Sequence, residues 1–216
     1  IKGLSERIKE SPEEKSKTIK PTEKKEYYPL SSAQMRMYIA HRMEKGNTSY
    51  NLPIFLTLKG ELNSEHMEHT FKRLTRRHNS LRTSFITVER IPFQVIHDHV
   101  DFKVEYDEGS EEEAIKIVQD FIRPFDLSNP PLLRVGVIKT GDSTYILMAD
   151  MFHIISDAAS IEVLIDDFKA LYAGQSLPPL KIQYQDFVEW QNWLIRSGKM
   201  EKQKHYWLSR FEPGNI

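Results

Sequence analysis

The chain has 216 residues, 30 of them Lys or Arg and 31 Asp or Glu, and it contains no cysteine. A formal net charge of -1 creates no global field that would attract nucleic acid or an anionic membrane, so neither is an expected partner. The lack of cysteine excludes a disulfide framework, a thiol nucleophile and a cysteine-ligated metal site, and it fits a cytoplasmic protein. No apolar run reaches the roughly 18 residues of a membrane-spanning helix, and no secretory signal pattern is present.

Residues 1–26 differ in composition from the rest of the chain. Residues 1–10 have a short apolar stripe at helical spacing, whereas residues 15–26 are rich in Lys, Glu, Thr and Pro and contain one aliphatic side chain. A segment of that kind buries too little apolar surface to offset its ordering entropy, so we expect a flexible linker or a solvated tail. Because the chain begins at Ile1 rather than Met, we also expect a fragment excised from a longer protein.

The globular pattern begins at residue 27, where helical and strand periodicities start to alternate. Helices are predicted over residues 32–43, 63–77, 111–122, 159–172 and 184–211, and strands over residues 50–59, 81–89, 92–96, 102–106, 132–139 and 144–150. Ser31 or Ser32 is suited to cap the first helix, and Asn63 or Ser64 the second. This interleaving predicts an α/β fold, a two-layer sandwich in which helices pack on one mixed sheet.

Residues 152–158 have the sequence Phe-His-Ile-Ile-Ser-Asp-Ala and lie between the last predicted strand and the helix that follows it. An imidazole at that place, the side chain of His153, can act as a general base near neutral pH. The carboxylate of Asp157 can hold the local geometry. A histidine at the end of a strand is also compatible with a structural or solvated side chain, so these residues indicate a candidate site without deciding its chemistry.

Three further segments accompany this one. They are Leu-Ser-Ser-Ala-Gln-Met-Arg-Met-Tyr at residues 30–38, Arg-His-Asn-Ser-Leu-Arg-Thr-Ser-Phe at residues 77–85 and Tyr-Gln-Asp-Phe-Val-Glu-Trp at residues 184–190. In this order the four segments resemble the motifs S-x-A-Q-x-R-x-[WY], R-H-E-x-L-R-T-x-F, H-H-x-x-x-D-G and Y-x-D-[FY]-x-x-W of the condensation domains of nonribosomal peptide synthetases. The wider group comprises acyltransferases built like chloramphenicol acetyltransferase. The resemblance extends over residues 28–210 and covers only the first half of the family's pattern.

The resemblance implies that residues 27–216 form the N-terminal lobe of a condensation domain and that residues 1–26 are the end of a carrier protein and its linker. The implied reaction joins carrier-bound acyl and aminoacyl thioesters through an amide bond within a multimodular nonribosomal peptide or hybrid polyketide synthetase. The implied partners are carrier protein domains and the C-terminal lobe of the condensation domain. Phosphopantetheine arms belong to the carriers, and no cofactor or metal is expected on this chain, which alone is expected to be inactive.

The resemblance also assigns roles to individual residues. His153 matches the second His of the family motif and would act as a base for the acceptor amine, or position it, or stabilise the tetrahedral intermediate. Phe152 replaces the first His, which is regarded as structural, so a hydrogen bond of that His is lost, at about 1–3 kcal/mol if its partner stays unpaired. Ala158 replaces the Gly, and its methyl group could narrow the channel or strain the turn.

The remaining site residues are expected to be structural. Asp157 is expected to pair with Arg82, which would brace the turn, with a helix-capping role for Asp157 as the alternative. Gln34, Arg36 and Tyr38 are expected to brace the same region from the first helix, although Arg36 could instead lie on a solvated face. Ser156 completes the group of residues expected to be structural at the site.

Two other classes of function stay open at this point. A noncatalytic carrier-docking or scaffold lobe is favoured by Phe152 and Ala158. A freestanding acyltransferase that uses coenzyme A would have to complete its site by oligomerisation, as the trimeric chloramphenicol enzymes do.

Overall fold

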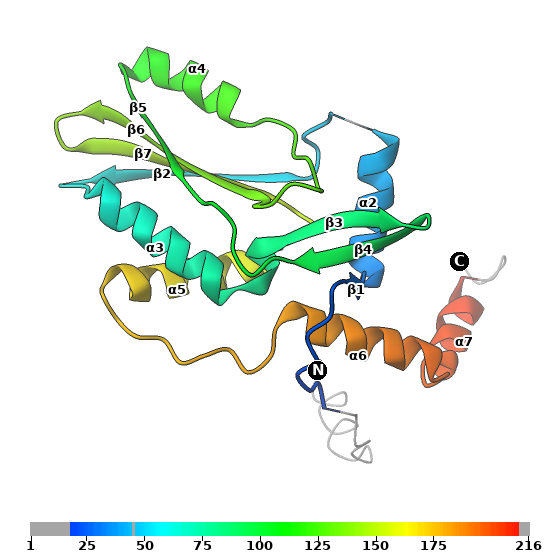
Figure 1. Ribbon diagram of the computed structural model, residues 1–216. Coiled ribbons are helices and arrows are strands. Elements are labelled where there is room, and N and C mark those ends of the chain that lie inside the picture. The colour runs from blue at the N-terminus through cyan, green and yellow to red at the C-terminus, as the bar shows by residue number, and fades with distance from the viewer. Residues whose placement is uncertain (1–17, 45, 212–216) are drawn as a thin grey trace, which may run out of the picture.

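The computed structural model describes residues 18–44 and 46–211, and the strands of this part form two sheets (Figure 1). The strands are β1 (Tyr28–Pro29), β2 (Asn51–Lys59), β3 (Thr83–Val88), β4 (Ile91–Ile96), β5 (Val104–Glu108), β6 (Leu133–Gly141) and β7 (Thr144–Phe152). One sheet has the order β1-β4-β3 and the other β2-β7-β6-β5, with β5 parallel to β6 and all other neighbours antiparallel. The predicted α/β class is confirmed, but the strands divide between two sheets rather than sharing one.

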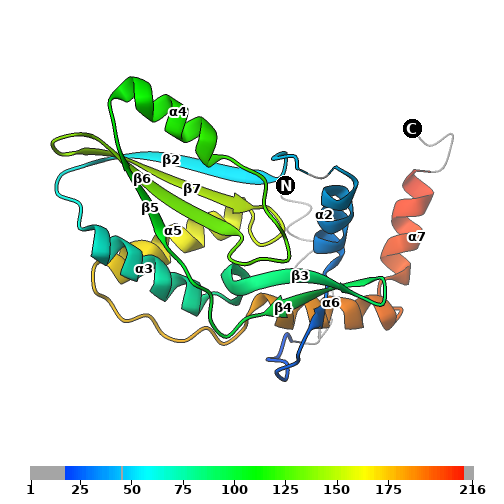
Figure 2. The ribbon, with the colours of Figure 1, turned by 45° about the horizontal axis from the view of Figure 1, so that its top comes forward.

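Six α-helices and one 3-10 helix are present in the described residues. They are α2 (Ser32–Met43), α3 (Ser64–Arg77), η1 (Asn79–Arg82), α4 (Glu111–Phe121), α5 (Ala158–Tyr172), α6 (Tyr184–Arg196) and α7 (Glu201–Arg210). Helices α3 and α5 cover one face of the four-stranded sheet, and α4 covers the other (Figures 1 and 2). None of these helices is long and apolar enough to cross a membrane.

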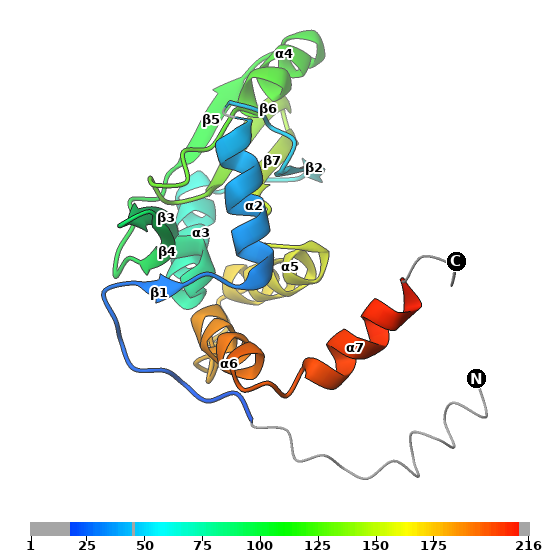
Figure 3. The same cartoon turned by 90° about the vertical axis from the view of Figure 1, so that its right-hand side faces the viewer.

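The predicted caps form at the first two helices. Ser31 and Gln34 make a reciprocal capping box at α2, and the Asn63 side chain accepts the N–H of His66 at the start of α3. The predicted last helix is interrupted, because Gly198 adopts a φ of 70° between α6 and α7. As a result α7 turns away from α6, as Figure 3 shows, and none of its residues is buried.

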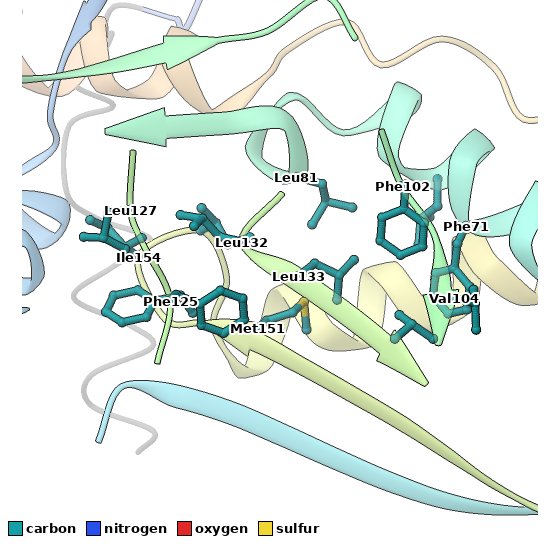
Figure 4. Packing of buried hydrophobic residues seen from close by; sticks show 14 of the residues in the cluster. Phe71, Leu81, Phe102, Val104, Phe125, Leu127, Leu132, Leu133, Met151 and Ile154 are labelled. Atoms are coloured by element: carbon teal, nitrogen blue, oxygen red, sulfur yellow. The ribbon is translucent and has the colours of Figure 1, made fainter. Parts of the chain in front are cut away.

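The main core lies between the four-stranded sheet, α3 and the segment that precedes β6 (Figure 4). Phe71 of α3 stacks on Phe102 with ring centroids 5.8 Å apart, and Leu81 and Leu132 are fully buried in the same cluster. A continuous apolar core of this kind holds the end of β7, and therefore the turn that follows it, in a fixed position.

On the other face of the sheet, α4 approaches β6 closely at Gly136. A Cβ atom at this position would lie 2.7 Å from the Met148 Cε and 3.0 Å from a ring carbon of Phe121. A side chain at this position would therefore require the flexible end of Met148 on β7 and the Phe121 ring of α4 to shift, so close packing and not an unusual backbone angle explains the glycine.

Part of the predicted linker contacts the folded domain. The backbone N–H of Thr22 donates to a carboxylate oxygen of Asp186 at 2.8 Å, and Lys25 pairs with Glu189 at 2.5 Å, both on α6. Residues 22–25 are therefore held against α6 instead of being a free tether. The predicted end of a carrier protein at residues 1–10 lies outside the described residues.

Candidate active site

His153 is placed by the turn that joins β7 to α5. Its backbone N–H donates to the Tyr50 carbonyl at 2.8 Å, which continues the pairing of β7 with β2 past the end of the strand. Its ring atom Nδ1 lies 2.8 Å from the Ser156 carbonyl oxygen. A carbonyl can only accept, so Nδ1 carries the proton in the neutral ring and Nε2 is left with a free lone pair.

The His153 side chain lines a cavity of about 480 Å³. Its walls come from α2, η1, the turn after β7, α5 and residues 180–184. The His153 residue is half-buried, so part of it remains accessible. An imidazole with a free Nε2 in such a cavity can accept a proton from a bound nucleophile.

Asp157 caps α5, and its predicted ion pair with Arg82 is wrong. The carboxylate accepts the N–H of Ser160 at 2.8 Å and its hydroxyl at 2.6 Å, and the side chain is exposed. Hydrogen bonds from Ser160 hold the pKa of Asp157 below its ordinary value. The alternative of a capping role is the arrangement that the structure has, because the cap partner is three residues away and needs no change in the chain path.

Arg82 braces η1 and not the turn that contains Asp157. Its guanidinium donates to the carbonyls of Thr75 and His97 and to the side-chain oxygen of Asn79. These bonds tie η1 to the end of α3 and to the residue after β4. Asn79, at the position where the motif has Glu, is thus an acceptor for Arg82.

The predicted bracing residues of α2 behave differently from one another. Gln34 is buried, caps α2 and lines the cavity. The Tyr38 hydroxyl bonds to that of Thr87 at 2.7 Å and fastens α2 to β3, away from the cavity. Arg36 is exposed and has no hydrogen bond or ion pair with the described residues, so the predicted bracing by Arg36 is wrong and its alternative, a solvated helix face, is what the structure has.

Phe152 is fully buried in a group of rings. Its centroid lies 5.2 Å from that of His41 in an edge contact, 6.1 Å from Tyr50 and 6.2 Å from Phe125. Beside it, Nδ1 of His41 is buried without a hydrogen-bond partner among the described residues, as is Oδ1 of Asn51, the residue opposite Phe152 on β2. Burial lowers the pKa of His41.

The family model described as Condensation domain matches residues 24–215. The chain belongs to the condensation domain family. It is 43% identical over 211 residues to gramicidin S synthase 2 of Brevibacillus brevis, which covers 98% of this chain and 5% of that protein. Over 193 residues it is 45% identical to tyrocidine synthase 3 of Brevibacillus parabrevis, covering 89% of this chain and 3% of that protein. The chain therefore spans only a small part of these relatives.

Solved structures confirm the fold predicted for a condensation domain. The X-domain in a complex with OxyB from teicoplanin biosynthesis matches with a TM-score of 0.83 at 23% identity, over 91% of this chain and 46% of that one. The condensation domain of the monacolin K polyketide synthase MokA matches with a TM-score of 0.78 at 20% identity, over 88% and 44%. This chain thus corresponds to less than half of each of these structures.

The two departures from the condensation-domain motif lie outside the cavity wall. Ala158 is the first residue of α5 and is exposed, and the non-glycine residues with positive φ in the described ranges are Glu89 and Arg90. The expected strain at Ala158 is therefore wrong, whereas the narrowing of the channel stays a prediction. Ser156 is buried, and its carbonyl accepts the hydrogen bond from Nδ1–H of His153. Its hydroxyl has no partner in the described part of the chain.

A buried ion pair close to Phe152 was not predicted. Asp150 of β7 is fully buried, and its Oδ2 accepts from Arg134 of β6 at 2.9 Å and from the Asn51 amide at 2.7 Å. Burial raises the pKa of Asp150 and lowers that of Arg134 to about 10. Arg134 and Asp150 are paired in the register of β6 and β7. A charged residue in each of two otherwise apolar strands is the sequence feature that could have predicted this ion pair.

The motif segment at residues 184–190 contacts the one at residues 30–38. The Tyr184 hydroxyl, whose pKa is raised mainly by burial, lies 2.9 Å from the Ser31 hydroxyl, and Tyr184 lines the cavity. No group of three or more His, Cys, Asp or Glu side chains suited to a metal ion exists in residues 18–44 and 46–211. The polar groups that line the cavity are imidazole, hydroxyl and amide groups and the carboxylate of Asp157.

Proposed function

We propose that this chain is the N-terminal lobe of a condensation domain and that, within a larger synthetase, it forms an amide bond between an acyl and an aminoacyl thioester. Partner carrier domains would deliver both groups on phosphopantetheine arms, and a C-terminal lobe would close the cavity. The observation that carries the proposal is the His153 side chain, which lines the cavity with Nδ1–H bonded to Ser156 and no partner for Nε2 among the described residues.

The reaction follows from that geometry. The acceptor amine attacks the thioester carbonyl carbon, the C–N bond forms, and Nε2 of His153 takes one amine proton. The tetrahedral intermediate then collapses, the C–S bond breaks, and the proton passes to the departing sulfur. Holding amine and thioester in one cavity supplies much of the acceleration, since it turns a bimolecular encounter into an intramolecular one.

Several residues would support this chemistry without touching the reacting atoms. Ser156 fixes the tautomer of His153, and Asp157 fixes the first turn of α5. Gln34 and Tyr184 form parts of the wall. The partly exposed His153 side chain of this lobe alone would be open to water, so we expect the isolated lobe to be inactive.

The second candidate is a noncatalytic docking lobe. It is supported by Phe152 in place of the motif's first His and by the fold neighbour that forms a complex with OxyB. A full-length protein whose two carriers are loaded with donor and acceptor separates the candidates. Condensation yields an amide-linked product on the acceptor carrier by mass spectrometry, whereas two carriers that stay separately loaded, although the carriers bind, would refute catalysis and favour docking.

A further inference from the structure

A basic hollow lies beside the cavity that contains His153. It has a volume of about 450 Å³ and is bounded by the C-terminal half of α3, the end of α5 and residues 176–183. Leu180 and Gln183 line both the hollow and the cavity, so the two are neighbours. The side-chain amide of Gln183 is fixed at this boundary, because it donates to the Arg77 carbonyl at 2.9 Å. An elongated ligand can therefore extend from the hollow to the cavity.

Two arginines of α3 have their charged ends fixed at the wall of this hollow. The guanidinium of Arg73 donates to the carbonyls of Leu171 and Gln175, each at 3.2 Å. The guanidinium of Arg77 donates to the Asp167 carboxylate at 2.8 Å and also to a carbonyl of the segment that follows α5. These bonds place both guanidinium groups where the end of α5 and the following segment face α3.

A third arginine of the hollow, Arg76, has no partner among the described residues. It is exposed, and it makes no hydrogen bond or ion pair with them. None of the described residues that line the hollow is acidic, and Asp167 offsets only the charge of Arg77. No carboxylate of the described chain pairs with Arg73 or Arg76, so the hollow favours an anion. The planar fork of a guanidinium suits phosphate in particular.

The separation between the hollow and His153 suits a ligand of defined length. Asp167, which holds Arg77, is ten residues along α5 from Asp157 in the turn of His153, or about 15 Å at 1.5 Å per residue. Phosphopantetheine has about 13 bonds between its phosphorus and its sulfur, as many as about four residues of extended chain, which span about 14 Å. A phosphate in the hollow therefore leaves the thioester at the distance of His153.

We propose that this hollow binds the phosphate of a phosphopantetheine arm whose thioester lies in the cavity. Arg76 donates to the phosphate oxygens, and Arg73 and Arg77 supply the surrounding positive charge. No covalent bond changes in this step. Because the phosphate stays remote from the reacting atoms, the hollow lowers KM and leaves kcat unchanged. This assignment rests on the proposed amide-forming function.

The experiment measures kcat and KM in the full-length protein with two forms of each substrate, the thioester of phosphopantetheine and that of pantetheine, which lacks only the phosphate. In the wild-type protein the phosphate should lower KM about tenfold for one of the two substrates, as one charged hydrogen bond predicts. Arg76→Ala should abolish this difference without affecting the fold, since Arg76 is exposed and has no partner among the described residues. Arg76→Lys, which keeps the charge and loses the fork, should retain part of it.

The matched control is Lys116→Ala, which removes an exposed cation of α4 on the other face of the sheet (Figure 1). This variant should keep the full effect of the phosphate. Equal KM values for the two thioester forms in the wild-type protein, or a phosphate effect that survives Arg76→Ala, would overturn the assignment.

Two further results separate the possible sources of the phosphate and of failure. Coenzyme A has the same arm, so a kcat/KM for coenzyme A thioesters above that for loaded carriers would overturn the carrier arm as the ligand. Failure of the proposed function has a different signature. No amide product would form with any substrate, while calorimetry would still show phosphopantetheine binding more tightly than pantetheine to the wild-type protein and not to Arg76→Ala.

Discussion

Replacement of Phe152 by His tests whether the buried atoms without hydrogen bonds around this ring can pair with an imidazole at position 152. Phe152 is fully buried, so Phe152→Ala should cost about 3–5 kcal/mol of unfolding free energy. Imidazole fills most of the benzyl volume, which leaves mainly the cost of burying a polar ring, about 1–3 kcal/mol if its nitrogens find no partner.

A partner is present in the structure. Nδ1 of His41 is buried and unpaired among the described residues, and its ring centroid is 5.2 Å from that of Phe152. An imidazole has one donor and one acceptor nitrogen, so it can match either neutral tautomer of His41. Pairing recovers the desolvation cost of Nδ1 at His41, again about 1–3 kcal/mol, so we expect Phe152→His to change stability by less than about 1 kcal/mol.

The assay is urea unfolding of the chain, followed by the fluorescence of its three tryptophans. His41→Leu supplies the control, because it removes the unpaired nitrogen in either background. The double-mutant cycle of Phe152→His with His41→Leu should give a coupling of about 1 kcal/mol or more. A loss of 3 kcal/mol in Phe152→His together with zero coupling to His41 would refute the reasoning.

Three further changes follow from the structure, all measured by the same unfolding assay. Asp150→Ala should cost about 3–5 kcal/mol because it leaves Arg134 uncompensated, and a cost below about 1 kcal/mol would show that water screens the pair. Gly136→Ala should cost about 1–3 kcal/mol because its Cβ meets Met148 and Phe121, and a neutral result would mean that Met148 and α4 adjust freely. Asp157→Ala should cost about 1 kcal/mol because it removes the cap of α5. The fold lowers the pKa of Asp157, so this contribution is complete above the unfolded pKa of about 4 and is lost as the pH falls through the folded pKa. A cost of Asp157→Ala that persists below the folded pKa would contradict this.

Local signals in the sequence predicted most of the elements. The caps at Ser31 and Asn63, and the change from strand to helix after His153, depend on neighbours within a few residues. The break at Gly198 was missed because the helical periodicity continues across it and gives no sign of the left-handed backbone angle there. The division into two sheets was also missed, since strand pairing is set by residues far apart in the chain.

The candidate site shows the same limit. The position of His153 was predictable from its motif, but the partner of Asp157 was not, because a distant Arg82 and a nearby Ser160 both suit a carboxylate. Ser160 is the partner in the structure because a contact between residues three apart requires a smaller loss of chain entropy. The pairing of Arg134 with Asp150 requires the register of β6 and β7, which the sequence alone does not determine. Since neither Phe152 nor Ala158 lines the cavity, we expect Phe152→His with Ala158→Gly to change the reaction rate little.

The most direct test of the account is the single-turnover rate of amide formation in the full-length protein with His153→Ala. The matched control is His69→Ala, an exposed histidine of α3 outside the cavity. Loss of the base should lower the rate about 10²- to 10⁴-fold with both carriers still loaded, while the control keeps its rate. A His153→Ala protein that forms the amide as fast as the control would contradict the assignment of His153 as the base.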